Sequence, residues 1–228
     1  MFSEVNMNTS VNIFTHNPVS DDELCVIRSR LPDFLSGKRL EHTFFVEKEA
    51  ITIAESIFLV YNVSDVYKND IKAAALLHDI TKKLSLDEQL ALCKEFGIDA
   101  GSSPSNAILH GKTAAYLAKK TFGINDFVFS AIYSHTTGKE NMNVIDKIIF
   151  LADYIEESRT HIHCINTRNF FYDSIKEHGV AYSGKALDDA IVMSIDGTVR
   201  HLLEQGSIID INTILARNYL ISENTQNT

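Results

Sequence analysis

Residues 69–82 are NDIKAAALLHDITK, an apolar helical pattern that ends in a histidine–aspartate pair and, one turn later, a lysine. The i, i+3, i+4, i+7 spacing of a single helix face is occupied by Ile71, Ala74, Ala75 and His78. Imidazole and carboxylate groups are costly to bury unless a partner neutralises or coordinates them. The pair His78-Asp79 therefore places two polar side chains, whose burial is costly, against a predicted hydrophobic core.

Helical patterns of the same kind occur on both sides of this segment. With approximate bounds, the predicted helices are 21–35, 38–60, 69–82, 105–122, 126–135, 144–157, 166–178, 183–205 and 213–220. A further helix lies between a capping box at Ser85 and a stop at Gly97, and Asp21 or Asp22 is the predicted cap of the first helix. No strand alternation stands out, so we predict an all-α bundle of about eight to ten helices.

Six polar side chains of the metal-binding type fall on the inward stripes of these helices: His42, His78, Asp79, His110, His135 and Asp153. A single histidine on an apolar face is more often a hydrogen-bonded core residue, and Asp153 alone would pass for a surface carboxylate. Independent accidents do not explain six such positions at once, so the set predicts a bound metal. Imidazole and carboxylate ligands without thiolate suit Fe, Mn, Co or Zn.

The six residues allow two arrangements, which the sequence leaves open. Two ions about 3.5–4 Å apart, bridged by Asp79, would use all six ligands. Alternatively, one ion takes four ligands and leaves His110 and His135 to bind phosphate. The four ligands of that single ion are His42, His78, Asp79 and Asp153.

The composition limits the classes of partner. The chain has 228 residues, 45% of them hydrophobic, and a formal net charge of −9. Proteins that bind nucleic-acid backbones usually carry the opposite charge, so we expect no nucleic-acid partner. Small phosphorylated ligands remain compatible, because a metal ion supplies local positive charge. No run approaches about 18 consecutive apolar residues, so we expect no membrane span.

The sequence predicts one domain, over residues 21–222. Residues 1–20 form a polar N-terminal extension, predicted to be disordered, and residues 223–228 form a tail. The extension lacks the basic and apolar regions of a signal peptide. The three cysteines are scattered and form no C-x-x-C pair, which favours reduced thiols. Together these features predict a cytoplasmic protein.

The ordered series H…HD…H…H…D resembles the signature of the HD-domain metal-dependent phosphohydrolases. The segments LLHDITK at 76–82, HTTG at 135–138 and LADYIE at 151–156 are similar to those of the YqeK-type HD proteins. These proteins hydrolyse diadenosine tetraphosphate symmetrically, giving two ADP. The resemblance extends over about residues 22–222 and implies an HD-domain helical bundle with this class of activity.

The resemblance also implies roles for the polar residues. Metal binding falls to His42, His78, Asp79 and Asp153. His110 and His135 match two intervening histidines that face the phosphates or a second ion. Iron is the implied metal, in a mononuclear or dinuclear site, with Mn, Co and Zn as alternatives.

Three further residues match positions that would serve a phosphorylated substrate. Lys82 matches the lysine of H-D-x-x-K and would face phosphate, although a lysine at a helix end also suits solvent. Thr136 belongs to HTTG, where its hydroxyl would hold phosphate oxygens, but a plain helix stop at Gly138 explains the segment equally well. Arg159 matches an arginine that follows D-Y-I-E-P, and Glu157 replaces the proline here, so the local turn is expected to differ.

Other basic residues and the C-terminal segment carry less information. Arg39 lies about one turn before His42, where it is either a site residue or a surface charge. The family's I-H-P-x-T is replaced by IDINT at 209–213, which puts ligand contacts from this segment in doubt. Arg217 is expected to close the C-terminal packing rather than to bind a nucleoside.

We therefore predict a metal-dependent hydrolase of dinucleoside polyphosphates, with Asp79, Lys82, His110 and His135 as its catalytic groups. Alarmone hydrolases usually have an acidic pair where this chain has Lys82-Lys83, and the G-Y-P element of cyclic-dinucleotide phosphodiesterases does not occur. Two alternatives stay open: an HD phosphohydrolase of mononucleotides or alarmones, and a nucleotide-binding regulator without turnover. A homodimer is compatible with the sequence.

Overall fold

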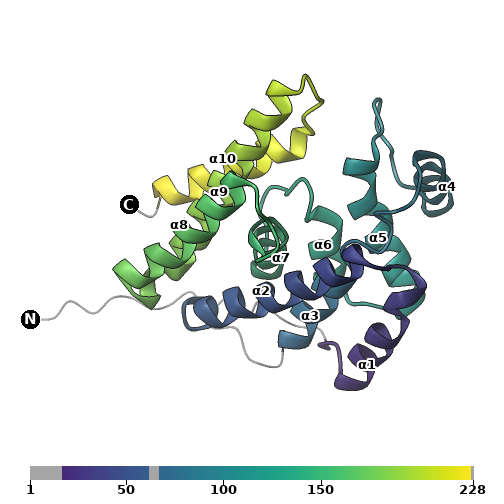
Figure 1. Cartoon of the computed structure of the whole chain (residues 1–228), viewed down its shortest axis with the longest axis horizontal. Coiled ribbons are helices and arrows are strands. Elements are labelled where there is room, and N and C mark those ends of the chain that lie inside the picture. Colours follow the sequence, from purple (N-terminus) through teal and green to yellow (C-terminus); the bar gives the residue numbers. More distant parts are fainter. Residues whose placement is uncertain (1–16, 62–66, 227–228) are drawn as a thin grey trace, which may run out of the picture.

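The computed structural model describes residues 17–61 and 67–226, and this part of the chain contains ten α-helices and no strand (Figure 1). The helices are α1 (Asp21–Arg30), α2 (Lys38–Tyr61), α3 (Lys68–Leu77), α4 (Leu86–Phe96), α5 (Asn106–Phe122), α6 (Asp126–Ser134), α7 (Val144–Ile155), α8 (Ile162–His178), α9 (Ser183–Glu204) and α10 (Ile211–Gln226). Short 3₁₀ segments follow α1 and α8. The predicted all-α bundle is confirmed.

Local sequence sets where several of these helices begin and end. Ser85 and Glu88 form the predicted capping box of α4, each side chain accepting a hydrogen bond from the other's backbone N–H. Gly97 ends α4, and Gly123 ends α5, both in the left-handed conformation that glycine adopts without strain. These boundaries are determined by residues close in sequence, and they agree with the prediction.

Two predictions for α1 are wrong. Its N-cap is Ser20, not Asp21 or Asp22, because Ser20 and Glu23 form a capping box in which each side chain satisfies the other's N–H. The helix also stops before its predicted end at residue 35. Pro32 lies in the following 3₁₀ turn and has no N–H with which to continue the α-helical ladder.

The helix that leads to the histidine–aspartate pair ends earlier than predicted. α3 stops at Leu77 rather than at residue 82, and the next turns are tighter, with the Lys82 N–H donating to the Asp79 carbonyl at 2.9 Å. The Thr81 hydroxyl donates to the His110 carbonyl on α5 at 2.8 Å. This bond between elements draws the segment away from the α3 axis and toward α5.

The boundaries of three other helices differ from the prediction. α7 ends at residue 155 rather than 157, because the next backbone position is extended. α8 begins at residue 162 rather than 166. α10 is longer at both ends than 213–220, and Asp210 begins it early by accepting a hydrogen bond from the Asn212 N–H at 2.9 Å.

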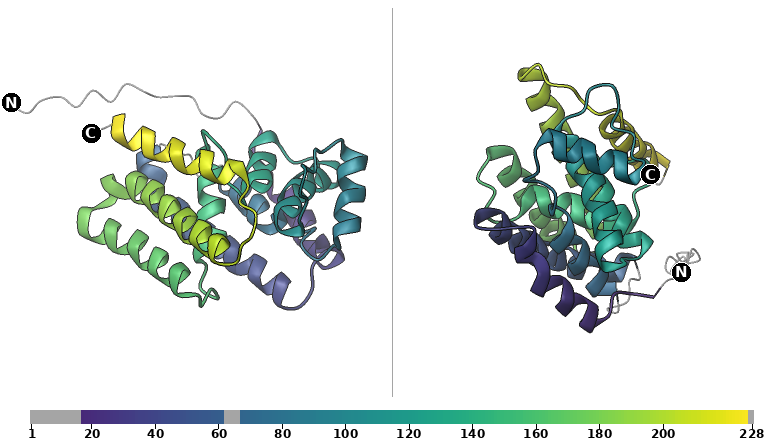
Figure 2. Two further views of the ribbon diagram at one scale, coloured as in Figure 1. Left: turned by 90° about the horizontal axis from the view of Figure 1, so that it is seen from above. Right: turned by 90° about the vertical axis from the view of Figure 1, so that its right-hand side faces the viewer.

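α7 is the centre of the bundle. It packs against α2, α3, α6, α8 and α9, and most of its side chains are buried. In Figure 1, α7 is seen nearly end-on, with α8–α10 on one side and α4 and α5 on the other. Figure 2 shows the same division from above, with α8, α9 and α10 forming one layer. A helix buried on almost every side fits the strongly apolar sequence VIDKIIFLADYI.

The N-terminal extension lies almost entirely outside the described residues, which begin at Asn17. Val19 is buried, and its N–H donates to the Asp70 carboxylate at 2.8 Å, so the last part of the predicted extension is attached to α3. Cys25, Cys93 and Cys164 are free thiols. Among the described residues, none of the helices combines the length and apolar character that a membrane span requires.

Candidate metal centre

The structure brings together all six predicted ligands from five helices or helix ends. His42 lies on α2 and His110 on α5, while the other histidines follow α3 and α6 directly. Asp79 lies at the middle of the group. Its carboxylate oxygens are 3.9 Å from His42 Nε2, 3.5 Å from His78 Nε2, 3.2 Å from His110 Nε2 and 3.7 Å from His135 Nε2. Asp153 Oδ1 is 3.0 Å from His42 Nε2 and 3.9 Å from His78 Nε2.

Potential ligand atoms form overlapping sets, each with its atoms within 4.8 Å of one another. One set is His42, His78 and Asp79, another is His78, His135 and Asp153, and a third is Asp79, His110 and His135. The first and third sets share only Asp79. The cluster therefore has two ends, one at His42 and the other at His110 and His135, with the Asp79 carboxylate between them.

The histidine rings are oriented by bonds on their outer nitrogens. His78 Nδ1 donates to the Ala75 carbonyl at 2.6 Å, and His135 Nδ1 donates to the Ile132 carbonyl at 2.7 Å. A carbonyl can only accept, so the proton is on Nδ1 and the Nε2 lone pair faces the cluster. His42 Nε2, His78 Nε2 and Asp79 Oδ1 are buried without a hydrogen bond. Buried polar atoms of this kind usually have a partner, and a cation would supply it.

The charge state of the cluster suits a cation. Burial raises the pKa of Asp79, but the adjacent imidazoles of His78, His110 and His135 outweigh it and hold the pKa well below its usual value. Burial likewise raises the pKa of Asp153, but the adjacent His42 imidazole and the charge of Arg159 outweigh it, and the pKa is lowered. Burial lowers the pKa of His110 to about 4, so its imidazole is neutral and able to act as a ligand.

Glu156 supports the cluster, and our sequence analysis missed it. This fully buried carboxylate accepts a hydrogen bond from His42 Nδ1 at 3.1 Å and others from Ser158. Burial raises its pKa, but the bonds from His42 and Ser158 prevail, and the pKa is lowered. A carboxylate bonded to the outer nitrogen of a ligating histidine fixes the ring and strengthens it as a ligand. The available signal was a second acid three residues after Asp153.

We expect Glu156→Gln to weaken metal binding by about 10–100-fold, because the neutral amide no longer stabilises the His42 ring as a donor. Competition with a chromophoric chelator would measure the dissociation constant. Glu157→Gln is the matched control, since the neighbouring Glu157 is exposed and pairs with Lys48 at 3.1 Å, away from the cluster. Equal affinities for the two variants would contradict this role for Glu156.

Lys82 and Thr136 lie at the end of the cluster formed by His110 and His135. Lys82 Nζ is 3.0 Å from His110 Nε2, and the side chain is half-buried, with its pKa lowered by burial. Because α3 ends before it, Lys82 does not occupy a solvated helix end. The Thr136 hydroxyl is 3.1 Å from His110 Nε2 and 3.2 Å from His135 Nε2. Both side chains are therefore in reach of a group bound at this end.

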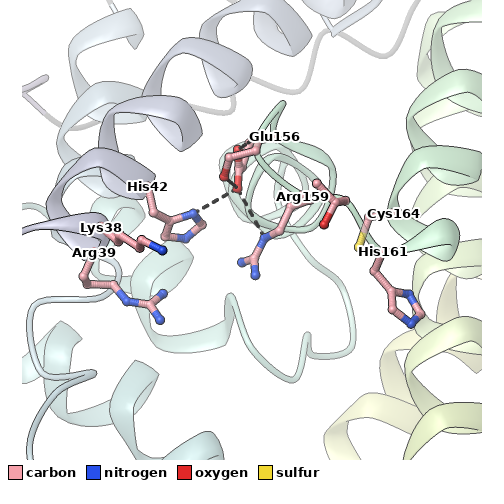
Figure 3. Close-up of a pocket in the computed structure, with 9 residues that line it drawn as sticks. Lys38, Arg39, His42, Glu156, Arg159, His161 and Cys164 are labelled. Atoms are coloured by element: carbon pink, nitrogen blue, oxygen red, sulfur yellow. Dashed lines mark hydrogen bonds and ion pairs between the residues drawn. The ribbon is translucent and has the colours of Figure 1, made fainter.

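Two arginines lie against the two aspartates. Arg39 Nη1 is 2.7 Å from Asp79 Oδ2, and Arg159 Nη2 is 2.5 Å from Asp153 Oδ1. Arg39, Arg159 and His42 line a cavity of about 410 Å³. In Figure 3, Arg39 and His42 extend from α2 toward Arg159, and His161 lies at the far side. Both arginines therefore lie beside the cluster.

Other residues of interest have structural partners. Gly111 follows His110 inside α5, where an added Cβ would lie 3.3 Å from the His135 ring, so glycine allows the close approach of the two histidines. A glycine within a helix was a usable signal for this contact. Arg217 pairs with Asp196 and joins α10 to α9, as expected from packing.

The sequence matches the HD domain family over residues 39–158, which is more than half of the chain and includes all six cluster residues. The chain belongs to the HD-domain family. Membership of the HD family and the histidine–aspartate cluster together support a divalent-metal site in this protein.

Similarity to named proteins covers more of the chain than the HD-domain match does. The symmetrical bis(5'-nucleosyl)-tetraphosphatase of Staphylococcus aureus is 32% identical over 195 residues, covering 84% of this chain and 89% of that protein. The enzyme of the same name from Bacillus subtilis is 28% identical, covering 82% and 92%. A crystal structure of a predicted HD superfamily hydrolase involved in NAD metabolism, from Clostridium acetobutylicum, superposes with a TM-score of 0.69 at 30% identity, covering 90% of this chain and 99% of that one.

Proposed function

We propose that the protein hydrolyses dinucleoside tetraphosphates symmetrically, and that diadenosine tetraphosphate is converted to two ADP. The observation that carries the proposal is the two-ended cluster around Asp79, with cationic side chains at both ends. A chain of four phosphates is long and strongly negative, and it needs positive charge on both sides of the bond that breaks. The names of the relatives agree with this substrate class.

A bound metal ion would supply Lewis-acid activation of a phosphoryl oxygen and an acidified water molecule. It would be held by His42, His78, Asp79 and Asp153, with a second ion at His110 and His135. The remaining groups act on the substrate. Lys82 and the Thr136 hydroxyl bind the oxygens of the phosphoryl group that is attacked, and offset the charge that grows there. Arg159 binds the phosphates of the departing half. Where no second ion is bound, the protonated form of His110 or His135 would donate its Nε2 proton to the leaving oxygen.

Iron is the proposed metal, and a dinuclear site is the proposed arrangement. The donor set contains imidazole and carboxylate but no thiolate, which is compatible with iron and also with Mn, Co and Zn. The sharing of Asp79 between two donor sets favours a bridging carboxylate. Elemental analysis of protein purified without oxygen, combined with an anomalous-scattering map, distinguishes the metals and counts the ions.

Separation of the products by ion-exchange chromatography tests the proposed reaction. With reconstituted protein and diadenosine tetraphosphate, we expect ADP as the only nucleotide product. Equal amounts of AMP and ATP would show attack at a different phosphorus and refute the symmetrical reaction. If an alarmone or a mononucleotide is hydrolysed faster than diadenosine tetraphosphate, the protein is an HD phosphohydrolase of that other substrate class. Tight nucleotide binding without hydrolysis, with every metal tried, would identify a regulator.

The proposal also includes a cytoplasmic location and a homodimer. The three thiols of the described residues are free, which agrees with a reducing cytoplasm. A homodimer stays a prediction, and sedimentation of the metal-loaded protein would test it.

A further inference from the structure

A second cavity, of about 570 Å³, adjoins the other end of the cluster. It lies between the start of α5, the turn after α6 and the connection from α9 to α10, and Ile108, Leu202 and Ile208 supply apolar walls. This volume is in the ordinary range for small-molecule sites, and such sites combine apolar walls with a few polar groups. None of the described residues that line this cavity also lines the cavity of Figure 3.

Thr136 joins this cavity to the cluster. It lines the cavity, and its hydroxyl is 3.1 and 3.2 Å from the inner nitrogens of His110 and His135. A ligand in the cavity would therefore lie next to a phosphate held at this end of the cluster. Asp210 also lines the cavity. Its negative charge opposes a phosphate and is compatible with the amino group of a base.

The cavity of Figure 3 has the opposite character. Lys38, Arg39, Arg159 and His161 contribute basic groups to its lining, and it borders the His42 end of the cluster. Its one acidic residue is Glu156, whose carboxylate is already bonded to His42 and Ser158. This lining suits phosphates. It does not provide two apolar surfaces between which a nucleobase would stack.

We infer that the two halves of the symmetrical substrate are held differently: the cavity beside Ile208 binds one nucleobase, and the basic cavity binds the other half by its phosphates alone. This inference rests on the proposed function. It predicts that adenosine 5'-tetraphosphate, which has a single nucleoside, is also a substrate. Water would add to phosphorus at the central bond, the bridging oxygen would leave with the other half and take up a proton, and the products would be ADP and pyrophosphate.

The experiment compares Ile208→Asp with Ile211→Asp. Both isoleucines are exposed, at 61% and 65%, so neither change should prevent folding, and only Ile208 lines the cavity. Binding of ADP to the metal-loaded protein is measured by calorimetry. We expect Ile208→Asp to weaken ADP binding by about tenfold, because an apolar contact with the base is replaced by a charge. Ile211→Asp should bind ADP like the parent protein.

Turnover of three substrates completes the test. The parent protein should cleave adenosine 5'-tetraphosphate with kcat/KM within about tenfold of that for diadenosine tetraphosphate, because the second base contributes little binding. Ile208→Asp should raise KM for both nucleoside substrates and leave hydrolysis of inorganic tetraphosphate unchanged.

Two results would overturn the inference: equal ADP affinity in the two variants, or a loss of about 100-fold or more in kcat/KM when the second nucleoside is removed. Failure of the proposed function is distinguishable from both. If ADP binding is weakened only by Ile208→Asp while no tetraphosphate is cleaved, the nucleobase cavity is supported and the hydrolytic function is refuted.

Discussion

Asp79→Ala is expected to remove both the bound metal and the hydrolytic activity. The Asp79 carboxylate belongs to both ends of the cluster and lies within 3.9 Å of four imidazole rings. Its pKa is held well below the usual value, so it supplies a full negative charge to the cation. Without it, the donor sets at the His42 end and at the His110 end each lose one of their three members. We expect activity to fall by about three orders of magnitude or more, since metal activation of water and of the phosphoryl group is lost.

Elemental analysis and initial rates, measured on the same folded samples, test this prediction. Asp146→Ala is a suitable control, because Asp146 is also a fully buried aspartate of this region but caps α7 and pairs with Lys139 at 2.9 Å. It should lower the melting temperature while leaving metal content and activity per folded molecule near the parent values. If Asp79→Ala retained full metal occupancy and near-normal turnover, the assignment of the centre would be wrong.

Lys82→Ala is expected to lower kcat/KM by about 100-fold while leaving the metal content intact. The Lys82 ammonium is close to His110 and half-buried, so it can face a phosphoryl oxygen at the cluster, and a protonated amine is not a metal ligand. Lys82→Glu should be more damaging than the alanine variant, because a carboxylate adds repulsion to the lost attraction.

Lys83→Ala is the matched control for Lys82. The neighbouring Lys83 is exposed and donates to the carbonyl and hydroxyl of Ser36, at 2.9 and 2.7 Å. Its removal should leave kcat/KM within about twofold of the parent, as for most exposed lysines. Unchanged kinetics in Lys82→Ala would return that residue to the role of a surface charge. Loss of metal in Lys82→Ala would show instead that it positions His110.

Local pattern was sufficient for much of the fold and for the choice of cluster residues. Helical periodicity predicted the number and type of elements, and the capping box at Ser85 and the glycine stops at Gly97 and Gly123 were visible because capping involves residues only a few positions apart. The cluster histidines were recognisable because each interrupts an apolar stripe. Burial of an uncompensated polar group is costly wherever the chain goes, so this signal does not depend on knowing the tertiary structure.

Contacts between distant segments decided what local pattern could not. α3 ends at Leu77 because the Thr81 hydroxyl bonds to the backbone of α5, a partner 29 residues further along the chain. Glu156 was missed because its significance comes from His42, which is 114 residues away. In both cases the hydrogen bond joins two residues that are far apart in the sequence and come together only when the helices pack.

The two ends of the cluster also arise from packing alone. The sequence indicated six candidate ligands in order along the chain, but their order does not say which of them lie together. The packing of α2, α5 and α6 around α3 and α7 places His42 on one side of Asp79 and the pair His110 and His135 on the other. The sequence therefore determined the chemical type of the site, a cluster of imidazole and carboxylate donors, because burying each of these side chains without a partner is costly. The division into two ends, and the unlike cavities beside them, depend on interhelix contacts that no local segment encodes.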